Sequence, residues 1–526
     1  MGSVLTVVAP ILSPSFLLSL YLASNMSPYH SRLYGAVSRR FFSSGRFLRA
    51  EFTSGQPLFE NRPHMVREGE LTTGISAQEY YERRLRLAKS MTQASIAILP
   101  GQSVRYASGS VFYQFQQNTD LYYFTGWNEP DSVAIIEKPT DKLEDVVFHM
   151  LVPPKDKTAE QWEGYRTGVQ GVQEIFNADE ADTTKNVSSY ISRLLNRNST
   201  VFYDFEDTSQ LTLTSLYNKF FQKSNSKFSG TLESLLKEHR VSVKSLSYIS
   251  NSLRAVKSSA ELDVMRLAGK ISGRAYNQAY AQRFPTEKHL CAFLEYQFIA
   301  GGCDKSAYVP VVAGGDHSLC IHYTRNDDVF KEDSLVLVDA GGNLGGYCAD
   351  ISRTWPVNGR FTGPQKELYQ AVLNVEKKCI EYCTESSNMS LQDLHNESIK
   401  LMTRELRNCG FGGLTQWETM KLYPHYIGHN LGIDVHDTPG YARTKKFQVG
   451  NVVTVEPGVY VPESNNYPSS FRGIGIRIED DVAVGKDSNI VLSVEAAKEI
   501  EDIESIAANG VTTPLSEVVN VWRDVK

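Results

Sequence analysis

Five residues in the C-terminal half of this chain have the types and spacing expected of a site for two metal ions. They are Asp339, Asp350, His429, Glu456 and Glu479. Four carboxylates and one imidazole form an oxygen-rich donor set, which suits hard or borderline divalent ions, Mn²⁺ above all, better than a thiolate cage would. Because carboxylates can bridge two cations about 3.5–4 Å apart and activate a water at neutral pH, the set predicts hydrolysis by a two-metal site.

Short strands are expected to position these carboxylates. In SLVLVDAGG, Asp339 ends a run whose alternate residues share one face of a strand. The Gly-rich segment 341–346 is expected to close a hairpin that brings Asp350, in the strand-like run YCADISRTW, to the same centre. In GIGIRIEDD, Arg477 and Glu479 are two residues apart and are therefore predicted to share a face, so that the cation orients the carboxylate.

Each motif taken alone has a simpler interpretation. An aspartate at a strand end is usually a turn or cap residue, and a lone histidine in an apolar run is usually a core residue. Short motifs also match by chance at a high rate. The prediction of a metal site therefore depends on all five motifs occurring in order, each in its own sequence context.

Composition restricts the class of protein. A chain of 526 residues is too long for one core and predicts two or three domains. The net charge is −6, which excludes the basic field typical of a nucleic-acid partner. The cysteines number seven, and no CxxC pair occurs among them. An odd count without such pairs favours reduced thiols in a reducing compartment.

The first 50 residues have the composition of a mitochondrial transit peptide. They contain arginine and serine in quantity and no Asp, Glu or Lys. The alternative is a membrane anchor or secretory signal over the apolar run Val4–Ala23. That run is interrupted by Pro10 and Pro14, and the positive charge follows it rather than precedes it. Composition therefore favours import into mitochondria.

The organisation of the remaining chain follows from periodicity. Residues 77–91 have helical spacing, and 95–100 and 131–138 are strand-like. Residues 222–258 are dense in Ser, Lys and Asn and are interpreted as a connection between domains, with some strand or helix within it. A strong helix is predicted to begin at Ser258, its N-cap. The predicted divisions are 1–50 for the transit peptide, 51–251 for an N-terminal domain and 252–526 for a catalytic domain.

The runs LVLVDAGG, YCADISRTW, HYIGHNLGIDVHD, TVEPGVY and GIGIRIEDD, in this order, resemble the pita-bread metallopeptidase family. The resemblance covers roughly residues 62–500 and is strongest to the mitochondrial aminopeptidase P and intermediate-cleaving peptidase group. RPHMVREGELTTGIS, QNTDLYYFTGWNEPD and WEGYRTG are similar to the N-terminal domain of that group, which methionine aminopeptidases lack. The resemblance implies an α/β (α+β) fold, with a creatinase/aminopeptidase P-like domain followed by a pita-bread domain.

The resemblance also implies a role for each site residue. Asp350 and Glu479 match carboxylates that bridge both metals. Asp339 matches a bidentate ligand of one metal, and His429 and Glu456 match ligands of the other. The residues that match substrate-contacting or transition-state-stabilising groups are His322, His425, His436 and Arg477. Glu456 binds one metal only in this scheme, so it is the expected proton shuttle to the leaving amine.

The function implied is a mitochondrial (matrix) dinuclear-metal aminopeptidase. It would remove single N-terminal residues from peptides, or from imported proteins after presequence cleavage. Two alternatives stay open: a Xaa-Pro aminopeptidase or dipeptidase acting on small peptides, and a pita-bread binding module without catalysis. Peptide or protein N-termini are the expected partners, together with a second copy of the chain and peripheral contact with the inner membrane. No nucleic acid is expected.

The run SRRFFSSGR gives a hypothesis about the maturation of the chain itself. A processing protease that cuts between Phe41 and Phe42 would leave Phe42 as the N-terminal residue. This enzyme, or another copy of it, would then remove Phe42 and expose Ser43. The alternative is that Arg-Phe-Phe is part of the ordinary amphipathicity of a transit peptide.

Overall fold

The computed structural model describes residues 53–205 and 226–511 of the chain. The transit peptide predicted over residues 1–50 and the processing hypothesis at Phe42 lie outside the described residues. Within the described ranges, no helix combines the length and the apolar character that a membrane span requires.

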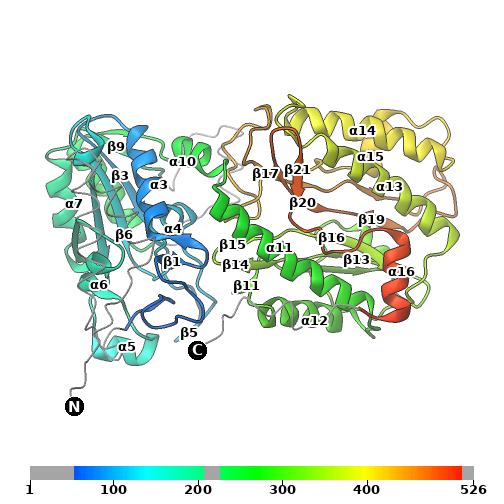
Figure 1. Cartoon of the computed structure of the whole chain (residues 1–526), viewed down its shortest axis with the longest axis horizontal. Helices are drawn as coiled ribbons and strands as arrows, with labels where there is room; N and C mark the ends of the chain where they lie inside the picture. The colour runs from blue at the N-terminus through cyan, green and yellow to red at the C-terminus, as the bar shows by residue number, and fades with distance from the viewer. Residues whose placement is uncertain (1–52, 206–225, 512–526) are drawn as a thin grey trace, which may run out of the picture. The chain divides into compact units, whose positions relative to one another are not determined.

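A six-stranded mixed sheet organises the first part of the described chain (Figure 1). Its strand order is β10-β9-β3-β6-β7-β8, with β3, β6 and β7 antiparallel and the outer pairs parallel. The elements of this part are β1 (Glu70–Thr72), β2 (Ile75–Ser76), α3 (Ala77–Lys89), β3 (Ser95–Pro100), β4 (Tyr106–Ser108), β5 (Val111–Phe112), α4 (Thr119–Thr125), β6 (Val133–Lys138), β7 (Val147–Val152), α5 (Lys157–Glu163), α6 (Gly168–Glu174), β8 (Glu180–Thr183), α7 (Val187–Leu195), β9 (Thr200–Phe202), α9 (Ser229–His239), β10 (Ser242–Lys244) and α10 (Ser247–Arg254).

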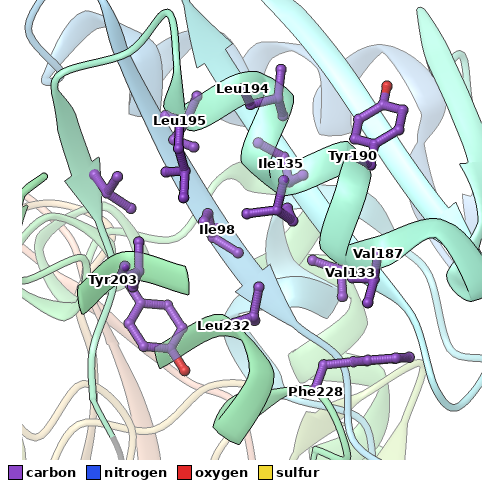
Figure 2. Close-up of a cluster of buried hydrophobic side chains, with 14 of the residues drawn as sticks. Ile98, Val133, Ile135, Val187, Tyr190, Leu194, Leu195, Tyr203, Phe228 and Leu232 are labelled. Carbon is purple, nitrogen blue, oxygen red and sulfur yellow. The ribbon is translucent and has the colours of Figure 1, made fainter. Parts of the chain in front are cut away.

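Helices α7 and α9 cover one face of this sheet and form a hydrophobic core with it (Figure 2). Helix α7 is apolar at the spacing of a single helical face, and the residues concerned are Val187, Tyr190, Ile191, Leu194 and Leu195. Leu194 belongs to the same buried cluster as Ile98 of β3, Ile135 of β6 and Leu232 of α9. Full burial of one such side chain stabilises the fold by about 1.5–3 kcal/mol, so this layer fixes the sheet against its helices.

Residues 222–258, interpreted as a connection between domains with some strand or helix within it, do contain strand and helix in their described part, but most of that part belongs to the six-stranded sheet and its helices. Residues 226–254 contain α9, β10 and α10, and β10 pairs in parallel with β9 as the edge strand of the sheet. The segment is polar in composition because an edge strand and half-exposed helices keep one side in water. Leu232 and Leu236 nevertheless bury completely in the core.

Glu137 of β6 gives the sheet a pH-dependent ion pair. Its carboxylate accepts hydrogen bonds from Arg197 at 2.6 and 2.7 Å and from the Asn198 amide at 2.7 Å, and it lies 3.1 Å from His149 Nε2. Burial alone would raise the pKa of Glu137, but these partners lower it to about 2. Because this value lies below the ordinary one, the stabilisation is present above about pH 5 and is lost as the pH falls toward 2.

We expect Glu137→Gln to lower the melting temperature at pH 7 by about 2–4 °C, because the charged hydrogen bonds are lost. The difference from the unchanged protein should shrink steadily below about pH 4.5. Thermal unfolding followed by circular dichroism between pH 3 and 8 measures this. Glu238→Gln, at an exposed position of α9, is the control. A difference in melting temperature that is the same at pH 7 and pH 3 would contradict the assignment.

Antiparallel sheets and paired helices form the second part of the described chain. Sheets β12-β13-β16 and β17-β20-β21 are joined by the smaller groups β11-β14-β15 and β18-β19. The elements are α11 (Ser259–Tyr280), α12 (Glu287–Ala300), β11 (Lys305–Ser306), β12 (Val311–Gly314), the 3₁₀ turn η3 (Gly315–Leu319), β13 (Leu335–Asp339), β14 (Gly342–Leu344), β15 (Tyr347–Cys348), β16 (Ser352–Pro356), α13 (Gly363–Glu381), α14 (Leu391–Asn408), α15 (Gln416–Leu422), β17 (Val452–Val455), β18 (Gly458–Tyr460), β19 (Gly475–Arg477), β20 (Asp480–Val484), β21 (Asn489–Val491) and α16 (Ile500–Asn509).

Helix α11 confirms the helix start predicted at Ser258. The Ser258 hydroxyl accepts from the Glu261 N–H, and the Glu261 carboxylate accepts from the Ser258 N–H, so a capping box marks the start of the helix. Helix α11 packs on β14 and β15 and α12 packs on β11 and β12, whereas α13 contacts β17 and β19 (Figure 1). These strands and the segments that connect them carry the residues of the predicted site.

The predicted fold class is confirmed as an α/β domain followed by a domain of antiparallel sheets and helix pairs. The helix expected at 77–91 and the strands expected at 95–100 and 131–138 are present as α3, β3 and β6. Helix α10 ends at Arg254 and α11 begins at Ser259. The domain boundary near residue 252 stays a prediction.

Candidate metal centre

Each of the four predicted carboxylate ligands lies where the chain leaves one sheet and enters another. Asp339 ends β13 and precedes β14, and Asp350 lies between β15 and β16. Glu456 lies between β17 and β18, and Glu479 between β19 and β20. The sequence prediction that the carboxylates sit in strands is therefore right for Asp339 only. The Pro457-Gly458 pair after Glu456 is a local turn signal, whereas no glycine or proline next to Asp350 or Glu479 marks the break there.

The predicted hairpin is present in a more elaborate form. Strands β13 and β16 are antiparallel, with Asp339 opposite Ser352, and the short strands β14 and β15 form an inner hairpin between them. Ser352, and not Asp350, is the first residue of β16. Its hydroxyl donates to Glu479 Oε2 at 2.6 Å and accepts from Arg477 Nε at 2.8 Å. Ser352 therefore orients a predicted ligand.

His429 comes to this centre on a segment that runs beside β17. The His429 N–H donates to Thr454 Oγ1, the Thr454 N–H donates to the His429 carbonyl, and the Glu456 N–H donates to the Ile427 carbonyl. Gly428 permits this approach, because a Cβ there would stand 1.9 Å from the Thr454 carbonyl oxygen. The two strand-like segments therefore place His429 and Glu456 side by side.

Three of the predicted ligands meet at one point. Asp350, His429 and Glu479 each offer a ligand atom, and these atoms all lie within 4.8 Å of one another. His429 Nε2 is 3.4 Å from Asp350 Oδ2 and 3.7 Å from Glu456 Oε1, which brings the fourth ligand into the group. The fifth, Asp339, is linked to Asp350 by Tyr308, whose hydroxyl lies 2.6 Å from an Oδ1 atom of each.

The charges in this carboxylate cluster are unbalanced. Burial raises the pKa of Glu456 to about 7, and the negative charges of Asp350 and Asp339 add to the effect. Burial and the neighbouring carboxylates raise the pKa of Glu479 well above its ordinary range. Burial alone would lower the pKa of His429, but its hydrogen bond with Asp350 and the charge of Glu456 raise it to about 9. A cluster of buried carboxylates attracts positive charge, and the His429 ring lies beside two of these carboxylates, Asp350 and Glu456.

The donor set and its orientation fit divalent cations. His429 Nδ1 donates to the Asn430 carbonyl at 3.1 Å, which leaves Nε2 as the nitrogen that faces the carboxylates. A metal-binding histidine commonly has this second hydrogen bond, which selects the tautomer and fixes the ring. Oxygen ligands outnumber nitrogen four to one, as hard or borderline ions prefer.

A hydrogen-bond chain links His425 to the cluster. His425 Nδ1 donates to the Tyr426 carbonyl at 2.9 Å, so Nε2 accepts from the Tyr460 hydroxyl, also at 2.9 Å. Arg477 donates to Tyr460 at 2.8 Å and to Asp339 Oδ2 at 2.7 Å. Burial and the charge of Arg477 lower the pKa of His425 to about 3. The imidazole is therefore neutral at physiological pH and is oriented by its neighbours.

His436 and His322 complete the predicted residues. The ring centroids of His436 and His429 are 4.2 Å apart, although the His436 side chain remains exposed on its outer side. Desolvation and the charge of His429 lower the pKa of His436 to about 4. His322 is exposed on the segment after η3, and its charge also lowers the pKa of both His425 and His436. The structure therefore brings all nine predicted site residues into one neighbourhood.

Sequence reasoning missed Tyr308, Ser352 and Tyr460. Ser352 lies two residues after Asp350 and Tyr460 four after Glu456, so the motifs themselves contained both. Tyr308 lies 31 residues before Asp339 in no recognisable pattern. Only the tertiary structure shows that its hydroxyl touches two carboxylates.

Comparison with protein families gives two matches. Residues 263–486 match metallopeptidase family M24, and residues 80–203 match the aminopeptidase P N-terminal domain. The first match includes all five predicted ligands.

Comparison with individual proteins extends the similarity to almost the whole chain. Intermediate cleaving peptidase 55 of Saccharomyces cerevisiae is 53% identical over 473 residues, which cover 89% of this chain and 92% of the yeast protein. A crystal structure of that yeast protein superposes with a TM-score of 0.78 at 52% identity and covers 84% of this chain and 100% of its own.

More distant relatives are named either intermediate cleaving peptidase or Xaa-Pro aminopeptidase. Intermediate cleaving peptidase 55, mitochondrial, of Arabidopsis thaliana is 35% identical, over 93% of this chain and 94% of its own. Xaa-Pro aminopeptidase 3 of Rattus norvegicus is 36% identical, over 86% and 90% respectively. The chain therefore belongs to metallopeptidase family M24, in its aminopeptidase P branch, and is a mitochondrial metallo-aminopeptidase.

Proposed function

We propose that this enzyme removes a single bulky N-terminal residue from imported proteins in the mitochondrial matrix, after their presequences have been cut off. One observation carries the proposal: the convergence of Asp350, His429 and Glu479 in a chain 53% identical to yeast intermediate cleaving peptidase 55. Membership of a peptidase family, with every predicted ligand retained, favours an enzyme over the alternative of a binding module without catalysis.

The proposed cofactor is a pair of Mn²⁺ ions held by the carboxylate cluster and His429. Asp350 and Glu479 would bridge them, Asp339 would bind one, and His429 and Glu456 would bind the other. Two bound cations would activate a water for attack on the first peptide carbonyl. Mn²⁺ is preferred to Zn²⁺ because four of the five ligands supply oxygen and none supplies sulfur.

The side chains around the cluster have separate proposed roles. Glu456 takes a proton from the attacking water and delivers it to the leaving amine, since its Oε2 faces His425 at 3.7 Å and its Oε1 faces His429. The neutral imidazoles of His425 and His436, together with His322, contact the substrate and stabilise the oxygen that becomes negative. Arg477 holds Asp339 and Tyr460 in place.

Restriction to the N-terminal residue follows from the charge of the site. A free α-amino group is positive at neutral pH, and the buried carboxylates attract it. An internal peptide bond has no such charge, so it gains nothing from this attraction. The same features permit cleavage of any peptide with a free N-terminus, including small peptides.

A Xaa-Pro aminopeptidase is the second candidate function, because the rat relative at 36% identity has that name. The two candidates differ in the residue after the cut bond. We expect the purified, Mn²⁺-loaded enzyme to cleave Tyr-Ser-Ala-Ala at least as fast as Tyr-Pro-Ala-Ala, and to leave the dipeptide Tyr-Pro almost uncut. Measurement of kcat/KM for the three peptides decides. A strong preference for proline in the second position would favour the Xaa-Pro reading.

Two expected properties of the assembly belong to the same proposal. We propose a homo-oligomer, supported by the exposed aromatic pair Tyr106 and Phe112 of the β4–β5 hairpin, each 56% exposed. We also propose peripheral contact with the inner membrane. Light scattering on the purified protein tests the first, and carbonate extraction of mitochondria tests the second.

A further inference from the structure

The segment 430–440, here called the His436 loop, contains no helix and only one isolated bridge, Asn430 to Val453. Its internal bonds are few: the Asp437 N–H donates to the Asn430 carbonyl at 2.8 Å, and the Gly432 N–H donates to the Asp434 carbonyl at 3.1 Å. An irregular segment with so few backbone bonds needs other contacts to stay in one conformation.

Those contacts come from charged side chains on both sides of His436. Asp434 Oδ2 lies 2.7 Å from Arg254 Nη2, and Asp437 Oδ1 is bonded to the same nitrogen. Asp437 Oδ2 accepts from Lys257 Nζ at 2.9 Å, with both side chains only 1% exposed. Two aspartates flank His436, the buried Asp437 and the partly exposed Asp434, and they are held by two cations at the end of α10 and just beyond it.

Arg254 also connects the loop to helix α4. Its Nη1 donates to Asp120 Oδ1 at 2.7 Å, and the neighbouring Thr119 hydroxyl donates to Asp434 Oδ1 at 2.8 Å. Helix α4 lies inside the match to the aminopeptidase P N-terminal domain, whereas the aspartates lie inside the match to family M24. One buried guanidinium, 5% exposed, therefore joins three carboxylates from both matched regions.

Three carboxylates face two cations here, so the network has no cation to spare. If Arg254 loses its charge, Asp437 keeps Lys257 and Asp434 keeps the Thr119 hydroxyl, but each carboxylate loses a charged partner, which is costly and favours a turn toward water. A turn of either aspartate toward water displaces His436, which lies between them in the chain. His436 lies 4.2 Å from His429, centroid to centroid, so a small displacement changes the geometry at the proposed reaction centre.

We propose that Arg254 is a positioning residue for His436, through which the N-terminal domain takes part in turnover. The inference rests on the proposed role of His436. The ion-pair partners of Arg254 are Asp120, Asp434 and Asp437, none of which is a predicted metal ligand. It keeps the His436 loop in its catalytic conformation through Asp434 and Asp437, and Thr119 and Asp120 of α4 fix Arg254 in turn. The geometry demands a planar fork, since one side chain must reach three carboxylates at once.

The test is a double-mutant cycle in the full-length, metal-loaded enzyme. We expect Arg254→Met to lower kcat about tenfold to a hundredfold, the effect of a displacement near 1 Å, with KM and bound metal nearly unchanged. Arg254→Lys should recover part of this loss. In a His436→Ala background, Arg254→Met should lower kcat less than about threefold, because its partner in catalysis is already gone. Arg193→Met, at an exposed site on α7, is the control.

The outcomes of the cycle distinguish failure of the inference about Arg254 from failure of the proposed role of His436. The same fold-loss from Arg254→Met with and without His436 would show a merely structural role and overturn the inference. Normal turnover by His436→Ala alone would instead refute the proposed role of His436, on which the inference rests. Should Arg254→Met fail to fold, Asp120→Asn removes one of the three carboxylates and carries the same comparison. If the losses of kcat from Asp120→Asn and His436→Ala are additive in the double variant, the inference is also overturned.

Discussion

Replacement of Asp350 or Glu479 by alanine is expected to abolish metal binding and peptide hydrolysis together. Both carboxylates lie at the point where the ligand atoms converge, within 4.8 Å of one another and of His429. As proposed bridges, each would bind both ions, so the loss of either loosens both. We expect turnover to fall by about three orders of magnitude or more, equivalent to about 4 kcal/mol of transition-state stabilisation.

Metal content by mass spectrometry and turnover of Tyr-Ser-Ala-Ala measure this result. His429→Ala should cost nearly as much, because His429 supplies the single nitrogen of the proposed ligand set. Asp333→Ala, an exposed carboxylate six residues before Asp339, is the matched control and should keep both metals. If the Asp350→Ala enzyme binds two ions and turns over peptide at the normal rate, the two-metal assignment is wrong.

The second large effect is expected from the histidines that surround the ligands. His322→Ala, His425→Ala and His436→Ala should each lower kcat by about a hundredfold to a thousandfold, the usual cost of one group that stabilises a developing oxyanion. Bound metal and melting temperature should change little, because none of the three is a proposed ligand.

Arg477→Ala should behave differently from the histidine variants. Its guanidinium donates to Asp339 Oδ2 at 2.7 Å, so its loss should weaken metal binding as well as turnover. His289→Ala is the control, because His289 is an exposed residue whose ring bonds to Thr286. Histidine variants that lose metal in step with activity would reassign the three histidines to the metal centre or its support.

The features that the sequence determined by itself depend on residues that are close together in the chain. Each ligand lies in a short run whose residue types and order identify the family, and the start of α11 at Ser258 follows from a capping box that spans four residues. Strands β3 and β6 follow from short apolar runs. Such signals involve neighbours in the chain, so one sequence is enough to find them.

The tertiary structure decided which residues complete the centre. Arg477 and Asp339 are 138 residues apart, and Arg254 and Asp437 are 183 apart, yet both pairs are hydrogen bonded. The breaks that place Asp350 and Glu479 between strands have no local turn signal, because neither residue has a glycine or proline next to it. Polar side chains in residues 226–254 likewise hid an edge strand that pairs with β9. Contacts of this kind depend on how sheets and helices pack, and no pattern within one segment of sequence encodes them.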